Sequence, residues 1–172
     1  MKQVFKPKKV IADKNLQSVI DVLNKTIFIS RVNCRVYGSA DQDDINDNSW
    51  TTLKFDVKDY DLGENYSVRT HSFTTPVPGY YEGILQVWLH DLLGDKRYGA
   101  GFLNVTSNEW LAIVFHSIGV APSAISIQAS FQCYIPRGND IVFKVYQQSG
   151  GSLVDVSHGQ WASWGTIKLF GI

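Results

Sequence analysis

Cysteine is scarce in this sequence, which has only Cys34 and Cys133 among its 172 residues. Two cysteines are too few for a disulfide framework or for a cysteine-based zinc site, so both kinds of cross-linked fold are excluded. Each cysteine lies in the apolar phase of a predicted strand. We therefore expect two buried free thiols, with a disulfide between them as the alternative.

No charge of one sign predominates. Sixteen basic and sixteen acidic side chains give a formal net charge of zero. A general nucleic-acid binder contacts phosphates through clustered Lys and Arg, so we expect no nucleic-acid partner. A neutral protein also gains little protection from self-repulsion, which favours assembly into a larger object.

Long hydrophobic runs are missing as well. The segment from Met1 to Lys9 has no apolar core of signal-peptide length, and no run approaches the length of a membrane span. We therefore expect no signal peptide, no membrane insertion and synthesis in a cytosol.

Sequence motifs of enzymes are absent too. There is no Gly-x-Ser-x-Gly, no phosphate-binding glycine loop and no His-Glu-x-x-His. The four histidines, His71, His90, His116 and His158, show no metal-ligand spacing. Asp91 follows His90 directly, and neighbouring strand residues point to opposite faces, so we expect the two not to act together. The sequence predicts no catalytic residue, no bound metal and no cofactor.

The first of two predicted regions, residues 1–25, is a basic arm followed by a short helix. Asp13 is a suitable cap, and apolar residues recur at helical spacing at Leu16, Val19, Ile20 and Leu23. A helix of about twelve residues is marginal alone in water. We expect it to pack on sister helices or on a docking partner, with its own head as the alternative. The arm would dock onto an acidic surface, unless its side chains are simply solvated, through Lys6, Lys8 and Lys9.

The second region, residues 26–172, is predicted as one all-β domain. Gly, Pro, Asn and Asp occupy most of the gaps between the predicted strands. These strands are expected near residues 27–37, 50–57, 65–74, 80–90, 99–106, 110–116, 125–135, 140–148 and 163–170. Many short strands at this spacing indicate an antiparallel sandwich of about ten strands.

Two predicted strands are apolar on both faces. Within residues 80–89 one phase is wholly apolar, and the opposite phase still contains two aromatic rings and an isoleucine; residues 110–115 behave likewise. A sandwich has one interior, so either sister copies around a threefold axis or a loop of the same chain must cover an outer face. In the threefold case the predicted interface residues are Tyr80, Ile84, Trp88, Trp110 and Tyr146.

Two loops contain candidate binding residues. The first offers the oxygen ligands that calcium prefers, at Asp41, Asp43, Asp44 and Asp47. It lacks the glycine and terminal glutamate of the familiar twelve-residue calcium loop, so a solvated loop is the favoured interpretation. In the second loop, Trp161 and His158 are predicted to contact a partner, because an exposed Trp ring offers a large rigid surface. Trp164, which follows, is predicted to be structural.

One stretch resembles a known family. It reads Phe73-Thr74-Thr75-Pro76-Val77-Pro78-Gly79-Tyr80-Tyr81, and with the later segments Gly138 to Val145 and Trp164 to Leu169 it is similar to the globular head of the complement one-q family. That head is a jelly roll shared with tumour necrosis factor. The resemblance implies a core aromatic at Phe73, a rigid turn at Pro76 and Gly79, and a strand facing a trimer axis from Gly138 to Val145. It also implies a trimeric binding head rather than an enzyme.

The helix and the basic arm stand where the family has a collagen-like stalk. We therefore expect the homotrimeric head of a bacteriophage fibre or receptor-binding tip, assembled in the host cytoplasm and located in the virion. Its N-terminus would dock onto other virion structural proteins, and its loops would bind a cell-surface glycan or protein with useful avidity. The alternatives are a capsid or baseplate protein that decorates or cements, a secreted complement-like or cytokine-like ligand, and a carbohydrate-active enzyme. The last requires paired carboxylates, and no convincing pair is visible.

Overall fold

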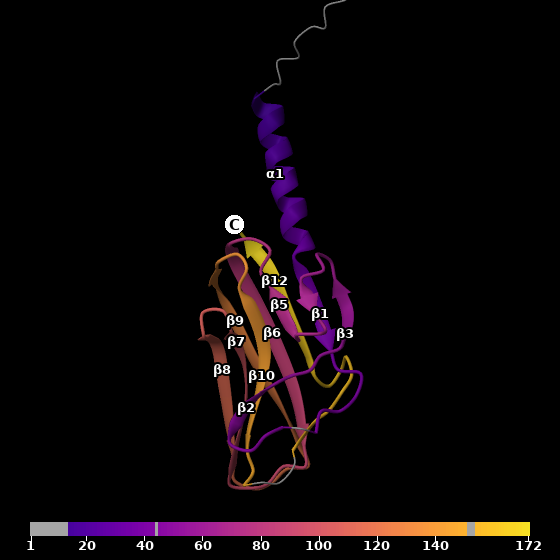
Figure 1. The fold of residues 1–172 in the computed structure, drawn as a ribbon, viewed down its shortest axis with the longest axis vertical. Coiled ribbons are helices and arrows are strands. Elements are labelled where there is room, and N and C mark those ends of the chain that lie inside the picture. The colour runs from indigo at the N-terminus through magenta and orange to yellow at the C-terminus, as the bar shows by residue number, and fades with distance from the viewer. Residues whose placement is uncertain (1–13, 44, 151–153) are drawn as a thin grey trace, which may run out of the picture.

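The computed structural model describes residues 14–43, 45–150 and 154–172. Two antiparallel sheets pack face to face, and a helix projects from one end of them (Figure 1). The predicted all-β class with a short N-terminal helix is confirmed.

Among the described residues, sheet A contains six strands, of which five lie side by side and the sixth is short. In spatial order these are β9 (Ala124–Ile135), β6 (Gly79–His90), β12 (Trp164–Gly171), β1 (Asn33–Tyr37) and β3 (Val57–Asp61). The short strand β11 (Asp155–Val156) pairs with the last residues of β6, beyond the start of β12.

Sheet B has the order β4 (Tyr66–Ser67), β5 (Ser72–Thr74), β10 (Asp140–Gln148), β7 (Lys96–Asn104) and β8 (Glu109–Ile118). Strand β2 (Ser49–Thr52) lies along β10, where Leu53 N donates to Phe143 O at 2.9 Å. Two predicted strands are therefore interrupted: 50–57 breaks between β2 and β3, and 65–74 breaks at a turn in which His71 has a φ of 53°.

The core lies between the sheets and is filled by strict alternation along the strands. In β6 every second residue from Gly79 to Leu89 is buried. Phe143 of β10 has its ring centroid 5.4 Å from that of Phe55 and 5.3 Å from that of Phe102. A Cβ at Gly165 of β12 would overlap the Phe143 ring, so this ring of sheet B packs directly against the backbone of sheet A.

The predicted rigid crossover joins β5 of sheet B to β6 of sheet A. Thr75 is buried and holds it in place: its N donates to Asn139 O at 2.9 Å, and its Oγ1 accepts from Asn139 N at 2.9 Å. Gly138, at a φ of 78°, supplies the left-handed turn that brings Asn139 to this position. The crossover is thus clamped by the turn before β10.

Helix α1 (Lys14–Arg31) is longer than predicted, and residues 27–31 are helical rather than part of a first strand. The β-branched and aromatic residues in this stretch favour a strand only weakly, and their context overrides that preference. Ile27 continues the helical spacing of Leu23, and the Thr26 hydroxyl bonds to Val22 O at 2.9 Å. The proposed cap Asp13 lies outside the described residues. No helix in the described part of the chain is long and apolar enough to cross a membrane.

Both cysteines are free, so the predicted free thiols are confirmed and the disulfide alternative is wrong. Cys34 in β1 and Cys133 in β9 are separated by two strands of sheet A. At about 4.8 Å per strand spacing, their Cα atoms are roughly 14 Å apart, about twice the span of a disulfide. Cys34 is fully buried, and Cys133 is half-buried.

The two thiols should therefore react very differently with a thiol reagent. Burial raises the pKa of Cys34 to about 12, and burial also raises the pKa of Cys133. Because the thiolate is the reactive species, we expect Cys34 to react only on unfolding and Cys133 to react slowly in the native protein. The rate of reaction with Ellman's reagent, followed over time in the native and in the unfolded protein, measures this difference. The Cys133→Ser variant should lose the reaction of the native protein. Native labelling that persists in Cys133→Ser would contradict the burial of Cys34.

Candidate functional site

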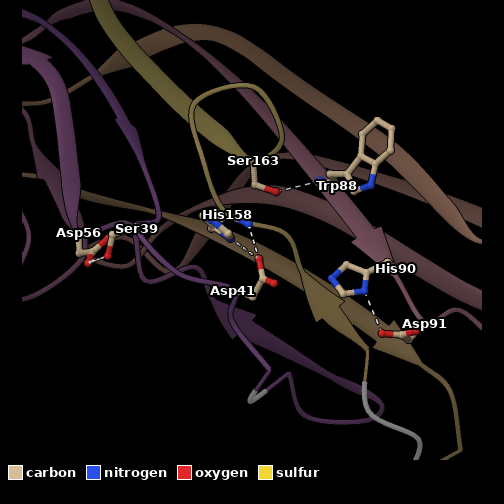
Figure 2. Close-up of polar contacts among 8 residues, drawn as sticks. All are labelled: Ser39, Asp41, Asp56, Trp88, His90, Asp91, His158 and Ser163. Carbon is tan, nitrogen blue, oxygen red and sulfur yellow. Dashed lines mark hydrogen bonds and ion pairs between the residues drawn. The ribbon is translucent and has the colours of Figure 1, made fainter.

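Two loops meet on the part of the head away from α1, and a histidine–aspartate pair joins them. Asp41 Oδ1 accepts from His158 N at 2.7 Å and lies 2.7 Å from His158 Nδ1 (Figure 2). These hydrogen bonds lower the pKa of Asp41 below its usual range. Nearby, the Ser39 hydroxyl and backbone N bind Asp56 and lower the pKa of that carboxyl too. The pair fixes the loop before β12 against the loop after β1.

Trp161 stands on this fixed loop with 82% of its surface exposed. Gln86 Nε2 donates to Trp161 O and to Ala162 O, both at 3.2 Å. Arg35 Nη2 donates to Gln160 O at 2.8 Å. The backbone that carries the indole ring is therefore held by side chains from two strands of sheet A.

Trp164 and Ser163 anchor the end of the same loop. Trp164 is half-buried, with the Arg35 guanidinium 4.9 Å from its ring centroid. Ser163 Oγ accepts from Trp88 N at 2.9 Å (Figure 2). The role of Trp161 and His158 in partner binding stays a prediction, but the geometry leaves the Trp161 ring accessible.

The four acidic residues proposed for calcium do not form one site in the described part of the chain. Asp41 is engaged by His158, whereas Asp47 Oδ1 accepts from Ser149 N at 2.8 Å and from Gly150 N at 3.1 Å. Asp43 is exposed, and Asp44 lies outside the described residues. Asp41 and Asp47 thus fix the loop to two different neighbouring segments.

The expectation that His90 and Asp91 cannot act together is wrong. Strand β6 ends at His90, and Asp91 has a φ of 59°, so the alternation of strand side chains no longer applies there. The Asp91 carboxylate turns back, and its Oδ2 lies 2.8 Å from His90 Nδ1 (Figure 2). Asp155 of β11 pairs with His90 across the ladder. The sequence spacing did not indicate that Asp155 lies beside His90 and Asp91.

Three of the predicted interface residues lie on the outer face of sheet A. Tyr80 and Trp88 are exposed, and Ile84 between them is half-buried. The ring of Tyr80 is 5.6 Å from that of Tyr134 on β9 and 6.1 Å from that of Phe170 on β12. We call Tyr80, Tyr134 and Phe170 the sheet A patch. Tyr134 and Phe170 could not be predicted from the sequence, because they lie beside Tyr80 only when β9 and β12 pair with β6.

The other two predicted interface residues, Trp110 and Tyr146, lie on the opposite sheet. Both contact Trp50 of β2, with ring centroids 4.5 Å and 5.4 Å away. Phe115 completes this group, 5.5 Å from Trp50 and 5.4 Å from Tyr146. We call these four rings the Trp50 cluster. Part of the outer apolar face is thus covered from within the chain by the strand residue Trp50, although Trp110 remains 37% exposed.

Helix α1 presents an apolar stripe that its own head does not cover. Its members are exposed: Leu16, Val19, Ile20, Leu23 and Ile27. Lys25 Nζ donates to the C-terminal Ile172 O at 2.9 Å, which marks the helix face turned to the head. At about 100° per residue, the stripe lies on the face opposite Lys25. The predicted docking residues Lys6, Lys8 and Lys9 lie outside the described residues.

No protein-family model matches the sequence, and no curated protein matches it. Solved structures do match in fold. The chain is similar to murine APRIL at pH 5.0, with 14% identity over 80% of this chain and 98% of that one and a TM-score of 0.58. Eiger TNF from S. frugiperda matches at 11% identity over 81% and 92%, with a TM-score of 0.57. The globular domain of zebrafish complement 1qA matches at 12% over 81% and 98%, with a TM-score of 0.50. The resemblance predicted from sequence is confirmed at the level of the fold, a jelly roll of this type.

Proposed function

We propose that this protein is a non-enzymatic, homotrimeric binding head of a virion appendage. Its N-terminal region docks it onto other virion structural proteins, and its opposite end recognises a cell-surface glycan or protein. The proposal rests on one observation: the molecule has an apolar helix and an exposed tryptophan at two separate places. An apolar helix that the head leaves uncovered projects from one end of a jelly-roll head (Figure 1). The exposed Trp161 lies on a separate loop, which leads into β12 and is held by Gln86 and Arg35.

The helix supports assembly because its stripe needs a second molecule to cover it. Leu16, Ile20, Leu23 and Ile27 follow the spacing of four, three and four residues that is typical of helices packed in a bundle. Val19 makes the stripe wider than the seam of a strict coiled coil, which uses only two positions in every seven residues. Parallel packing of such helices around an axis buries these side chains and holds the heads together.

The head supports a ring of copies rather than a twofold dimer. The sheet A patch and the exposed edge of the Trp50 cluster are different surfaces on opposite sheets. A contact that uses both is heterologous, since one patch of a copy meets the other patch of the next copy. Heterologous contacts close when the rotation between copies divides a full turn, and three copies form the smallest such ring above a dimer.

Trp161 supports recognition at the other end. Its loop is held by Gln86 and Arg35, so little backbone freedom is lost when a partner covers the ring. Three copies present three such rings, and multivalent contact raises the affinity for a surface that carries repeated ligands. Within the described residues, the hydrogen bonds of His90 and His158 join them to aspartates and to no serine or cysteine nucleophile, which supports binding rather than hydrolysis.

Two other functions share this architecture. The likeness in fold to APRIL and to Eiger TNF favours a secreted ligand as the second candidate. A protein that only cements its neighbours in a capsid or baseplate has the same helix and the same trimer but does not need an accessible Trp161.

The test combines native mass with surface binding of the full chain. We expect a native mass of three times 19.3 kDa and binding to whole bacterial cells or to an immobilised glycan panel. Trp161→Ala should reduce that binding by at least about 30-fold, since a central Trp contributes about 2 kcal/mol or more. The trimer should remain, because Trp161 belongs neither to the helix stripe nor to the two aromatic surfaces proposed for the contact between copies.

Val120→Ala is the matched control, because Val120 is 91% exposed and lies outside the Trp161 loop. A monomer at micromolar concentration would contradict the assembly. Trp161→Ala that binds like the unmodified protein would contradict the recognition site. A trimer that binds neither cells nor glycans would support the cementing function instead.

A further inference from the structure

The end of β6 and the short strand β11 bring three metal-ligand side chains together. His90 and Asp155 are paired across the ladder, and Asp91 is turned back onto His90 by its left-handed backbone. One ligand atom from each of the three lies within 4.8 Å of the others. Figure 2 shows the His90 ring and the Asp91 carboxylate facing each other at this end of the strand.

Asp155 supplies an independent sign of a cation site. Its Oδ1 is buried and has no hydrogen-bond partner among the described residues. A buried carboxylate oxygen without a partner destabilises a fold, because it has lost its water and gained nothing in return. Asp155 adjoins Val156, whose backbone is hydrogen-bonded to Gln42, and lies three residues before His158, whose backbone donates to Asp41, so its position is set by the fold rather than by a free loop.

The surroundings are electronegative. Burial raises the pKa of Asp155, and the charges of Asp43, Asp91 and Asp41 raise it further, against the opposing effect of His90. Four carboxylates thus contribute to one small region, and no Lys or Arg side chain forms an ion pair with Asp155 or Asp91 among the described residues. A divalent cation would offset this concentration of negative charge.

We propose that His90, Asp91 and Asp155 bind a divalent transition-metal ion of the Zn²⁺ class at the end of the head opposite α1. An imidazole nitrogen with two carboxylates suits such ions, whereas Ca²⁺ takes six to eight oxygen ligands and no nitrogen. In a tetrahedral zinc site with bonds of about 2.0–2.2 Å, the ligand atoms are roughly 3.4 Å apart. The three atoms now lie within 4.8 Å of one another, so binding requires side-chain adjustments of about an ångström. A fourth position stays open for water or for a group on a partner.

The ion would tie β11 to the end of β6. Val156 of β11 exchanges backbone hydrogen bonds of 3.0 Å with Gln42, and His158 two residues on holds Asp41. A metal at Asp155 would therefore stabilise the segment that leads into the Trp161 loop. The proposal does not depend on the trimer or on the partner, because all three ligands belong to one chain.

The full chain, treated with a chelator and then dialysed, should bind Zn²⁺ with one ion per chain in isothermal titration calorimetry. Its thermal midpoint should rise in the presence of the ion, because the ion binds only the folded site. His90→Ala and Asp155→Asn should each weaken Zn²⁺ binding by at least about 10-fold, the lower range found when a metal site loses a supporting group. His116→Ala, an exposed histidine on β8, is the control and should bind as the unmodified protein does.

Asp155→Asn separates a ligand from a merely structural residue. Without metal, this variant should be as stable as the unmodified protein or more stable, since it removes the charge of a half-buried carboxylate whose Oδ1 is buried and unpaired within the described residues. A loss of stability in the metal-free state, with Zn²⁺ binding unchanged, would overturn the proposal. Equal binding by His90→Ala, or binding lost only in His158→Ala, would overturn it as well, the latter by moving the ion to the Asp41 pair.

Discussion

Replacing Ile20 and Leu23 together with aspartate should separate the proposed trimer into monomers while the head stays folded. Both side chains lie on the stripe opposite Lys25, where the head cannot cover them. In a helix bundle the new carboxylates would be buried without partners, at a cost of about 3–5 kcal/mol for an uncompensated charge. At 1.4 kcal/mol per tenfold, this lowers the association constant by at least about 100-fold. Sedimentation velocity over a range of concentrations measures the change.

The matched control places the same two charges elsewhere on α1. Ser18 and Asn24 are exposed and lie outside the stripe, so Ser18→Asp with Asn24→Asp should leave the native mass unchanged. Circular dichroism should show the strand signal intact in both variants. If the Ile20 and Leu23 variant remains a trimer, the heads alone hold the assembly and the stripe serves a docking partner instead.

Phe143→Ala should cost about 3–5 kcal/mol of unfolding free energy, the range for removing a buried phenylalanine. The Phe143 ring is fully buried and contacts rings on both sides, at Phe55 and Phe102. Domains of this size are stable by about 5–15 kcal/mol, so the variant should lose a large share of its stability. Urea unfolding followed by fluorescence gives the value, at one fixed protein concentration because an oligomer's stability depends on concentration.

Gly165 provides a sharper version of this test. A side chain at Gly165 overlaps the Phe143 ring, so Gly165→Ala should be destabilising in the native sequence and much less so when Phe143 is already Ala. A double-mutant cycle that shows no coupling would contradict the contact between the sheets. Leu62→Ala, at a side chain that is 59% exposed, is the control and should change stability by no more than about 0.5 kcal/mol.

The local sequence pattern predicted a helix or strand correctly wherever the same spacing of apolar residues continued along the whole of it. Alternating apolar residues predicted β6, β9, β10 and β12, and the prolines around Val77 predicted the crossover between sheets. The pattern was ambiguous at residues 27–31, where the same apolar residues suit a strand and the continuation of a helix. There the helix formed because its spacing continues from Leu23, and propensity alone is too weak to decide.

The candidate sites were harder to predict, because their members meet only in three dimensions. Asp155 reaches His90 through the pairing of β11 with β6, across a sequence separation that no motif spans. Asp91 reaches His90 because the chain leaves the strand conformation at that residue. Trp50 joins Trp110 and Tyr146 because β2 lies alongside β10 through backbone hydrogen bonds. No periodic pattern in the sequence predicts any of these contacts.

The sequence by itself determined the all-β class, the N-terminal helix with its apolar stripe and the rigid crossover at Pro76 to Gly79. Each depends on hydrophobic periodicity or on a residue type whose backbone preference is strong and local. Only the tertiary structure decided which apolar surfaces stay uncovered and which polar residues meet. Strand order and register set those contacts, and they depend on packing between distant segments, which a local pattern does not specify.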